Sequence, residues 1–347
     1  MCKKSAKRAR NEEASITLRC VGFCGADDSC EPELLAAVSA QYDWVEWGVL
    51  FRHDKEGEPR YASSAWLKRL AAVNSKRTMH LAGHLCSQRV DELLRGDATF
   101  VRHLHKEIGF NRVQINATAA NNCDIAAFGS SAGADKCVAA LRDAFAAVPD
   151  VEFILQRNRE TKALWERLVA EPPPNMSLLF DDSMGLGVST SSWPEPPSLH
   201  SLKFGYAGGL SPDNIVEKLE TMDTAAVRSS SRRAAAAAGT AFIAAPLQHA
   251  QILTQHLSRQ RARDAPPPAL ACLPFLLCCL SHPLLLLTPP DAQAGRTLWV
   301  DMETSLRTVL KDNSDIFDVN KAMRCVTAVI EQGRTPVHAS KSRGEGA

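Results

Sequence analysis

The segment LKFGYAGGLSPDNIVEKLETM, at positions 202–222, contains one complete strand–turn–helix unit. Its apolar run at 202–207 predicts a buried strand, and the glycine pair that follows predicts a tight turn. Pro212 suits the first turn of a helix, and Ile215 and Leu219 would lie on the apolar face of that helix. A unit of this kind is typical of α/β proteins, in which helices cover a parallel sheet.

The same alternation recurs along the rest of the chain. Further apolar runs predict strands at 16–24, 44–51, 78–82, 112–116, 151–155, 177–180 and 297–302. Amphipathic segments predict helices at 31–41, 63–74, 88–95 with a continuation to 106, 134–148, 161–171, 212–222 and 319–330. Eight strands that alternate with helices favour a closed (β/α)8 TIM barrel over an open sheet, so the predicted fold class is α/β with a single barrel domain.

Composition limits both the organisation of the chain and its partners. The 347 residues are 45% hydrophobic, which is ample for a packed core, and the formal net charge is +1. A nucleic-acid binder needs a basic surplus, so we expect no nucleic-acid partner. The 11 cysteines are an odd number without paired spacings, which indicates a reducing compartment rather than a disulfide framework. We therefore expect a cytoplasmic protein, and we expect it to be a monomer.

One stretch differs in composition from the rest. Positions 225–295 are rich first in Ala and Arg, then in Pro, then in Leu, which predicts a low-complexity insert before the eighth strand. The barrel would then consist of 16–224, with seven strands, and 296–332, with the eighth strand and the last helix. Positions 1–15 and 333–347 are predicted to be disordered tails, the first of them basic. The apolar part of the insert contains prolines, and we expect no membrane span.

Four predicted strand ends carry residues with useful chemistry. In a (β/α)8 barrel the reactive groups lie at the C-terminal ends of the strands. Cys24 ends the first strand, Asp181 follows the sixth, and Asp301 lies near the end of the eighth. The pair Gly208 and Gly209 follows the seventh strand and precedes a helix, a pattern in which backbone N–H groups can bind phosphate. These positions predict a site for a small phosphorylated molecule.

Short motifs at these strand ends are more specific. They are FCG at 23–25, GVLF at 48–51 followed by PRYAS at 59–63, LFD at 179–181, and AGGLSPDNI at 207–215. In this order they resemble motifs of the phosphoribosylanthranilate isomerase family, which acts in tryptophan synthesis. The resemblance covers roughly 16–222 and 297–330, and the PRY and AGGLSPDNI motifs are its most specific parts.

This resemblance implies a reaction and a pair of catalytic groups. The reaction is the Amadori rearrangement of N-(5′-phosphoribosyl)anthranilate, which needs no cofactor. Asp181 would be the general acid that protonates the furanose ring oxygen, and Cys24 would be the general base that takes the C2′ proton. The ordinary pKa values of a carboxyl and a thiol lie on the wrong sides of neutrality for these roles, so both would have to be tuned.

The resemblance also implies the residues that bind the substrate. Arg60 would hold an anionic part of it, a role to which a guanidinium is suited. Asp301 would lie near the substrate at the end of the eighth strand. Gly208 and Gly209, with Ser305, would hold the phosphate.

The chain departs from the family motifs at three places. The family's Lys-x-Cys-Gly begins with Gly22 here, its Gln-Leu-His-Gly has Asn116 in place of the histidine, and its Asp-Val-Ser-Ser-Gly-Val-Glu reads DMETSLR at 301–307. Glu303 would bring negative charge close to the phosphate. A diverged phosphate-binding barrel with another substrate, or a non-catalytic binding module, is therefore the alternative to the isomerase.

Two other patterns suggest different chemistry. GSSAG at 129–133 fits the nucleophile elbow of α/β-hydrolases, with Ser131 as nucleophile and Asp181 and His200 as partners. A glycine–serine loop at the start of a helix explains the same residues. His80 and His84 have a spacing that could hold a metal ion, but solvated or core histidines are the commoner explanation, and we expect no metal.

Overall fold

The computed structural model describes residues 17–184, 187–188, 192–199, 201–223 and 297–336, which all belong to one compact unit. The predicted tail at 1–15, the insert at 225–295, and positions 337–347 of the C-terminal tail lie outside the described residues. The same holds for His200, the proposed hydrolase histidine. None of the helices within the described ranges is long and apolar enough to cross a membrane.

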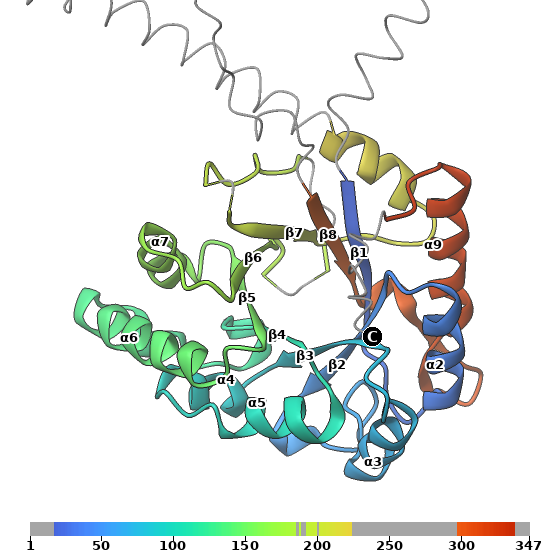
Figure 1. The fold of residues 1–347 in the computed structure, drawn as a ribbon, viewed down its shortest axis with the longest axis horizontal. Helices are drawn as coiled ribbons and strands as arrows, with labels where there is room; N and C mark the ends of the chain where they lie inside the picture. Colours follow the sequence, from blue (N-terminus) through green and yellow to red (C-terminus); the bar gives the residue numbers. More distant parts are fainter. Residues whose placement is uncertain (1–16, 185–186, 189–191, 200, 224–296, 337–347) are drawn as a thin grey trace, which may run out of the picture. The chain divides into compact units, whose positions relative to one another are not determined.

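Eight parallel strands form a closed barrel in which each strand pairs with its neighbours in chain order and β8 pairs with β1 (Figure 1). The strands are β1 Thr17–Cys24, β2 Val45–Phe51, β3 His80–Leu85, β4 Arg112–Ile115, β5 Glu152–Arg157, β6 Met176–Phe180, β7 Lys203–Ala207 and β8 Thr297–Met302. The predicted (β/α)8 TIM barrel is thereby confirmed. The bounds of β8 agree with the predicted run, whereas β3 begins two residues later and ends three residues later than predicted.

Helices surround this barrel on the outside (Figure 1). They are α2 Pro32–Gln41, α3 Ser64–Val73, α4 Gln88–Leu94, α5 Thr99–His103, α6 Ser131–Ala147, α7 Lys162–Ala170 and α9 Val319–Glu331, and residues 215–223 are also helical. The helix predicted at 88–95 agrees with α4, but its predicted continuation to 106 is interrupted. Gly96 takes a left-handed backbone (φ +85°) that ends α4, and α5 continues into a π-helix, Leu104–Ile108.

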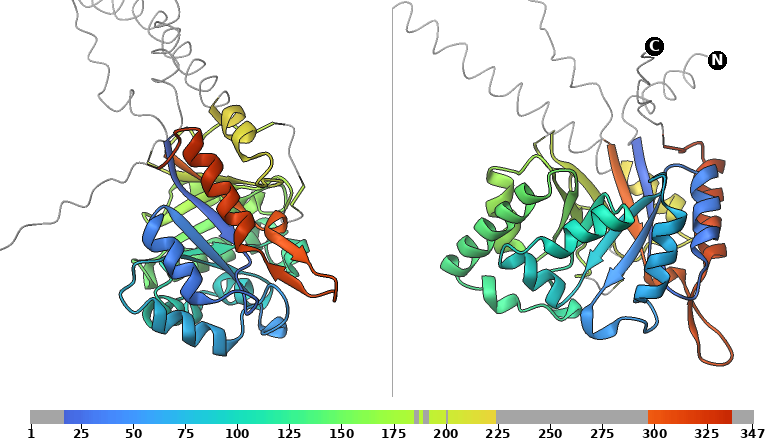
Figure 2. Two further views of the ribbon diagram at one scale, coloured as in Figure 1. Left: turned by 90° about the vertical axis from the view of Figure 1, so that its right-hand side faces the viewer. Right: turned by 60° about the horizontal axis from the view of Figure 1, so that its bottom comes forward.

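A short hairpin between β8 and α9 was not predicted. A 3-10 turn, Thr304–Leu306, leads into the antiparallel strands β9 Arg307–Val309 and β10 Asp315–Phe317. The hairpin extends beyond the end of the barrel (Figure 2). Its strands have three residues each, which is too short for the alternation of polar and apolar residues to be recognised in the sequence.

The lower interior of the barrel, at the N-terminal ends of the strands, contains a buried ion-pair network. Nη1 of Arg112 lies 2.6 Å from Oε1 of Glu46, and Nη2 lies 3.2 Å from Oε1 of Glu152. The guanidinium also stacks on the ring of Trp299, with 4.2 Å between Cζ and the ring centroid. The Trp299 ring occupies the space beside Gly205, where a Cβ atom would overlap it. This layer fills the interior at the N-terminal ends of the strands.

Candidate active site

A cavity of about 250 Å³ opens at the C-terminal ends of the strands. Its polar and glycine lining residues come from β3 to β8 and the loops after them, and they are His84, Gln114, Asn116, Asn121, Gln156, Asp181, Ser183, Gly187, Gly208, Gly209, Ser211, Asp301, Glu303, Thr304 and Ser305. Five residues predicted from the sequence therefore lie around one cavity: Asp181, Gly208, Gly209, Asp301 and Ser305. A larger cavity of about 460 Å³ lies between α3 and the α5 segment and contains none of the predicted site residues.

Cys24 ends β1 and is completely buried. It does not line the cavity itself but lies against a residue that does, because its Sγ is 3.1 Å from Nδ1 of His84. Burial raises the pKa of the Cys24 thiol well above its ordinary value, and the carboxyls of Glu303 and Asp301 raise it further. Burial also lowers the pKa of His84 to about 3, with a smaller contribution from Arg112. Near neutral pH the pair therefore consists of a neutral thiol and a neutral imidazole.

Two glycines leave room for this pair and for the carboxyl beside it. A Cβ atom at Gly48 would lie 2.9 Å from Cα of Cys24 and 2.9 Å from Nε2 of His84. A Cβ atom at Gly22 would lie 2.6 Å from Oδ1 of Asp301. Real Cβ atoms do not approach other atoms so closely, so the lysine that the family motif has at position 22 could not fit beside Asp301 in this position.

Asp301 is a buried carboxyl next to the thiol–imidazole pair. Its Oδ2 lies 4.0 Å from Nδ1 of His84. Burial raises the pKa of Asp301 well above its ordinary value, and the negative charges of Glu46 and Glu303 act in the same direction. This carboxyl therefore holds a proton more readily than one in water.

Asp181 follows β6 on the other side of the cavity, and it is also buried. Its Oδ2 accepts a hydrogen bond from Nε2 of Gln156 at 3.1 Å, and its Oδ1 accepts one from the hydroxyl of Ser183 at 2.5 Å. These two bonds fix the plane of the carboxyl group at the cavity wall. Gln156 was not predicted from the sequence, although its position two residues after Ile154 in β5 places it on the inward face.

The predicted phosphate-binding residues lie next to Asp181. Gly208 and Gly209 both have left-handed backbones (φ +107° and +65°), which explains why glycine occupies both positions. The hydroxyl of Ser305 donates to the carbonyl of Leu210 at 2.7 Å and so ties the end of β8 to this loop. The N–H of Ser211 donates to Oδ1 of Asn214 and is already bonded within the loop.

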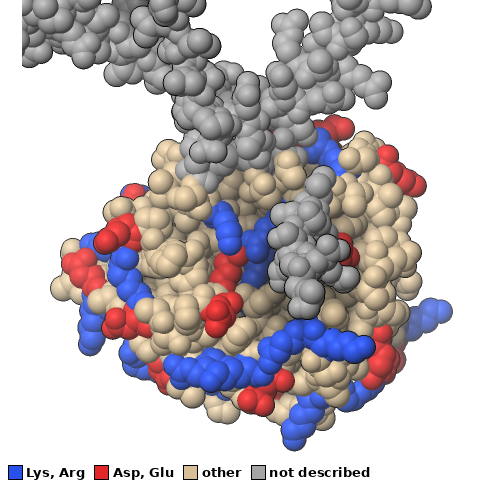
Figure 3. All heavy atoms as spheres, in the orientation of Figure 1, with Lys and Arg blue, Asp and Glu red and all other residues tan. Residues whose placement is uncertain are grey.

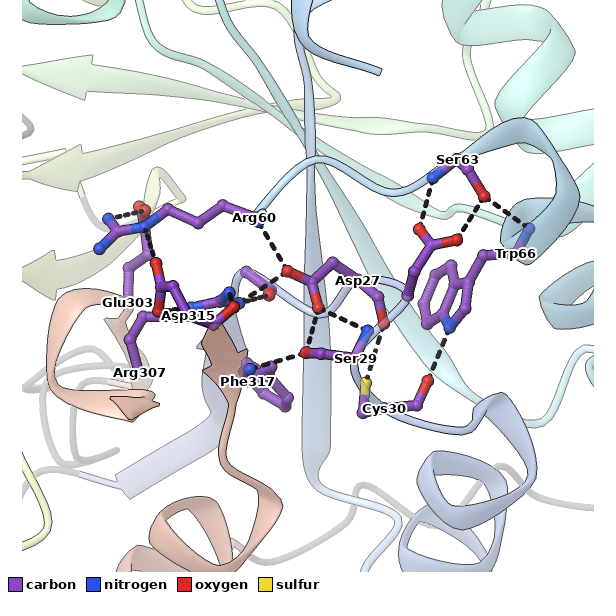
Figure 4. Close-up of polar contacts among 12 residues, drawn as sticks. Asp27, Ser29, Cys30, Arg60, Ser63, Trp66, Glu303, Arg307, Asp315 and Phe317 are labelled. Atoms are coloured by element: carbon purple, nitrogen blue, oxygen red, sulfur yellow. Dashed lines mark hydrogen bonds and ion pairs between the residues drawn. The ribbon is translucent and has the colours of Figure 1, made fainter. Parts of the chain in front are cut away.

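Arg60 belongs to a separate network beside the cavity, and it does not line the cavity itself (Figure 4). Its Nε lies 3.2 Å from Oδ2 of Asp315, and its Nη1 lies 3.5 Å from Oε1 of Glu303. The buried Arg307 in turn binds Asp315 and Asp27. Burial alone would raise the pKa of Asp315, but the hydrogen bonds and charges of the two arginines lower it. To bind a substrate anion, Arg60 would have to exchange carboxylate partners.

The charge of the cavity is acidic. Three carboxyl groups line it, those of Asp181, Asp301 and Glu303, and its described lining residues include no lysine or arginine. Burial raises the pKa of Glu303, although Arg60 and Arg307 act in the opposite direction. On the molecular face drawn in Figure 3, basic and acidic side chains are intermixed. Basic side chains nevertheless form a continuous band across the lower part of this view.

The other two patterns in the sequence have structural explanations. The run before GSSAG is a 3-10 helix, Ile125–Phe128, so the strand that a nucleophile elbow requires is missing. Ser130 caps α6 by accepting from the N–H of Gly133, and Ser131 accepts from Arg167. The described residues contain no group of three or more His, Cys, Asp or Glu arranged to hold a metal ion.

Comparison with known proteins identifies no family for this chain. No family model matches it, and neither does any curated protein. Several solved structures overlap with it, and two of them illustrate the low similarity. Monomers generated from the dimeric phosphoribosylanthranilate isomerase of Thermotoga maritima are 14% identical, with a TM-score of 0.33 over 59% of this chain and 83% of that one. A family 18 chitinase from Crocus vernus is 9% identical, with a TM-score of 0.29 over 59% and 76%.

Proposed function

We propose that this barrel is an isomerase that converts N-(5′-phosphoribosyl)anthranilate to the corresponding 1-deoxyribulose phosphate by general acid–base catalysis. The observation that carries the proposal is the placement of three groups around one end of the barrel. These are the Asp181 carboxyl, the Cys24–His84 pair, and the left-handed glycine pair that begins at Gly208. The motifs that resemble the isomerase family contain Asp181, Cys24 and Gly208. No cofactor takes part in this reaction.

The reaction would proceed in two proton-transfer steps. Asp181 protonates the ring oxygen, the bond from that oxygen to C1′ breaks, and the lone pair of the anthranilate nitrogen forms a C1′=N bond. The thiolate form of Cys24 then takes the proton from C2′, and the electron pair of that bond forms C1′=C2′, which neutralises the iminium nitrogen. Return of a proton to C1′ and loss of the 2′-hydroxyl proton to Asp181 give the ketone and restore the acid. Each of the two groups thus donates one proton and accepts one proton during the reaction.

The binding roles are part of the same proposal. Backbone N–H groups around Gly208 and Gly209 would bind the phosphate, supported by the N-terminus of the helix at 215–223 and by Ser305. Asp301 would lie beside the reacting carbons, close to His84. Arg60 would bind the anthranilate carboxylate after releasing Glu303.

The decisive experiment measures turnover by the full chain. The unstable substrate is generated in the cuvette by an anthranilate phosphoribosyltransferase, and loss of its fluorescence is followed. Cys24→Ala and Asp181→Asn should each reduce kcat by about 100-fold or more, the usual contribution of a general acid or base. Cys137→Ala and Asp135→Asn, both on α6 away from the cavity, serve as matched controls. Absence of turnover by folded protein would reject the isomerase, and full activity of either site variant would remove that residue from its role.

The acidic lining favours a second candidate. A phosphate would lie close to carboxyls at Asp301 and Glu303, and the described lining residues include no basic side chain to balance them. A diverged barrel that binds a neutral or cationic sugar derivative would not have to place a phosphate beside these carboxyls. Thermal unfolding in the presence of ribose 5-phosphate, ribose or an aminosugar separates the two candidates. Stabilisation by the phosphate ester alone supports the isomerase, and stabilisation by the aminosugar alone supports the second candidate.

A further inference from the structure

The geometry points to His84 as the proton acceptor of Cys24, so that the base at this site is a thiol–imidazole pair rather than a lone thiolate. The chemistry of this inference rests on the proposed isomerase reaction. The contact itself does not, because it is present whatever the substrate is. His84 contributes a nitrogen that faces the thiol and also lines the cavity.

The contact is built by three adjacent strands. Cys24 on β1 is paired in register with Gly48 on β2, and Leu50 of β2 is paired with His84 on β3. The inward sides of β1 and β3 therefore meet across position 48. Because Gly48 has no side chain there, Sγ of Cys24 and Nδ1 of His84 approach to 3.1 Å. Any larger residue at position 48 would separate them.

A proton acceptor beside the thiol solves a problem of charge. A thiolate enclosed by protein and close to two carboxyls is costly to form. In a concerted relay the thiolate never has to exist as a free ion. As the C2′–H bond breaks and a new S–H bond forms, the original S–H bond breaks and its proton moves to Nδ1 of His84. The C2′–H electron pair passes into C1′=C2′, and the iminium nitrogen takes the pair of the C1′=N bond.

The positive charge that the relay creates on the imidazole lies next to a carboxyl group. Oδ2 of Asp301 lies 4.0 Å from Nδ1, and Glu303 of the same strand end lies beyond it. Arg112 opposes the charge from the layer below, and Cys86, directly after β3, and Tyr61 are further titratable groups near the thiol. Reversal of the relay returns the proton through Cys24 to C1′. The imidazole is thus a temporary store for one proton during the conversion.

Nitrogen NMR of the histidine side chains tests the pair without any substrate. In the full chain labelled with ¹⁵N-histidine, Nδ1 of His84 should give the resonance of an unprotonated nitrogen that accepts a hydrogen bond. Cys24→Ala should shift this resonance more than that of any other histidine, and Cys137→Ala should leave it unchanged. A protonated Nδ1, or a resonance that does not respond to Cys24→Ala, overturns the inference. This measurement keeps His84 in place, so it does not depend on the folding of a histidine variant.

Kinetics supply the second test. His84→Gln should lower kcat by about 100-fold at pH 7 with little change in KM, and the remaining rate should rise with pH as the solvent takes over removal of the thiol proton. His103→Gln, an exposed histidine on α5, is the control. Equal kcat and an unchanged pH profile in His84→Gln overturn the inference even if the isomerase is real. If the wild-type chain has no isomerase activity, the proposed function fails, and the NMR result alone decides whether the pair exists.

Discussion

The burial of His84 predicts a defined dependence of stability on pH. Its side chain is 3% exposed and its pKa is lowered to about 3, whereas an unfolded chain has a histidine pKa of 6.5. The folded state therefore resists a proton that the unfolded state accepts. Above pH 6.5 the imidazole is neutral in both the folded and the unfolded state, so its titration does not reduce the stability of the fold. As the pH falls from 6.5 towards 3, the folded state loses stability.

The size of this loss follows from the two pKa values. The full difference of pKa corresponds to about 5 kcal/mol, reached only at very low pH. Between pH 7 and pH 5 the loss is about 2 kcal/mol, because the unfolded histidine takes up its proton over this range while the buried one does not. The figure for pH 5 hardly changes if the folded pKa is 4 instead of 3, so it is a firm basis for an experiment.

Urea unfolding of the wild-type chain and His84→Gln at pH 7 and pH 5 measures this quantity. Other carboxyl and histidine groups titrate in both proteins, so the difference between them isolates position 84. The variant loses the packing of the ring at both pH values. The difference in unfolding free energy between the variant and the wild type should nevertheless shift by about 2 kcal/mol in favour of the variant between pH 7 and pH 5. This shift corresponds to about 1 M in the urea midpoint. His103→Gln checks that a histidine-to-glutamine change has by itself no such effect.

Parallel behaviour of the two proteins would refute this reasoning. If the free-energy difference between wild type and His84→Gln is the same at pH 5 and pH 7, the imidazole titrates alike in the folded and unfolded states. It would then not be the neutral, enclosed group that the relay with Cys24 requires.

Three further perturbations test the barrel itself. Arg112→Met leaves Glu46 buried without its cation, which should cost about 3–5 kcal/mol of stability and lower the midpoint of thermal unfolding by about 10 °C. Glu46→Gln in the same chain should restore most of the lost stability. A change of the midpoint below about 2 °C would contradict the network. Gly205→Ala forces a methyl group into the Trp299 ring and should cost about 1–3 kcal/mol in urea unfolding, a loss that Trp299→Leu should relieve. Deletion of 225–295 should leave the unfolding midpoint of the barrel unchanged in calorimetry, because the sequence predicts that this segment is not part of the barrel; a large drop would show that it is.

The sequence predicted the barrel well because a parallel barrel has a strong and repetitive pattern. Its strands are buried on both faces, so each one is a short apolar run between helical segments, and eight such runs leave few alternatives. Local backbone detail was harder to predict. The break at Gly96 depends on a left-handed backbone, and the β9–β10 hairpin depends on contacts of its loop with the barrel rim, such as that of Arg307 with Asp27.

The site was predictable in position but not in contacts. Strand ends define the rim, and Asp181, Asp301 and the glycine pair beginning at Gly208 lie around one cavity there. Which side chain meets which depends on the register between strands, and this is not visible in one sequence. For that reason His84 was considered only together with His80, although the alternation of β3 places residues 82, 84 and 86 on one face.

The departures from the isomerase motifs are concentrated on one side of the cavity. Gly22 lies against Asp301, Asn116 donates to the thiol of Cys86, and Glu303 pairs with Arg60, so all three belong to the half formed by β1 to β4 and β8. The half formed by β6 and β7, with its carboxyl and its glycine pair, keeps the motif. Substitutions that accumulate after loss of function would be spread over both halves of the cavity. Glu303 also lies at the strand end where the resemblance would place the phosphate, so part of the phosphate site departs from the motif together with the side of the thiol. The thiol–imidazole contact lies on that altered side, and it is therefore the first feature of this protein to test.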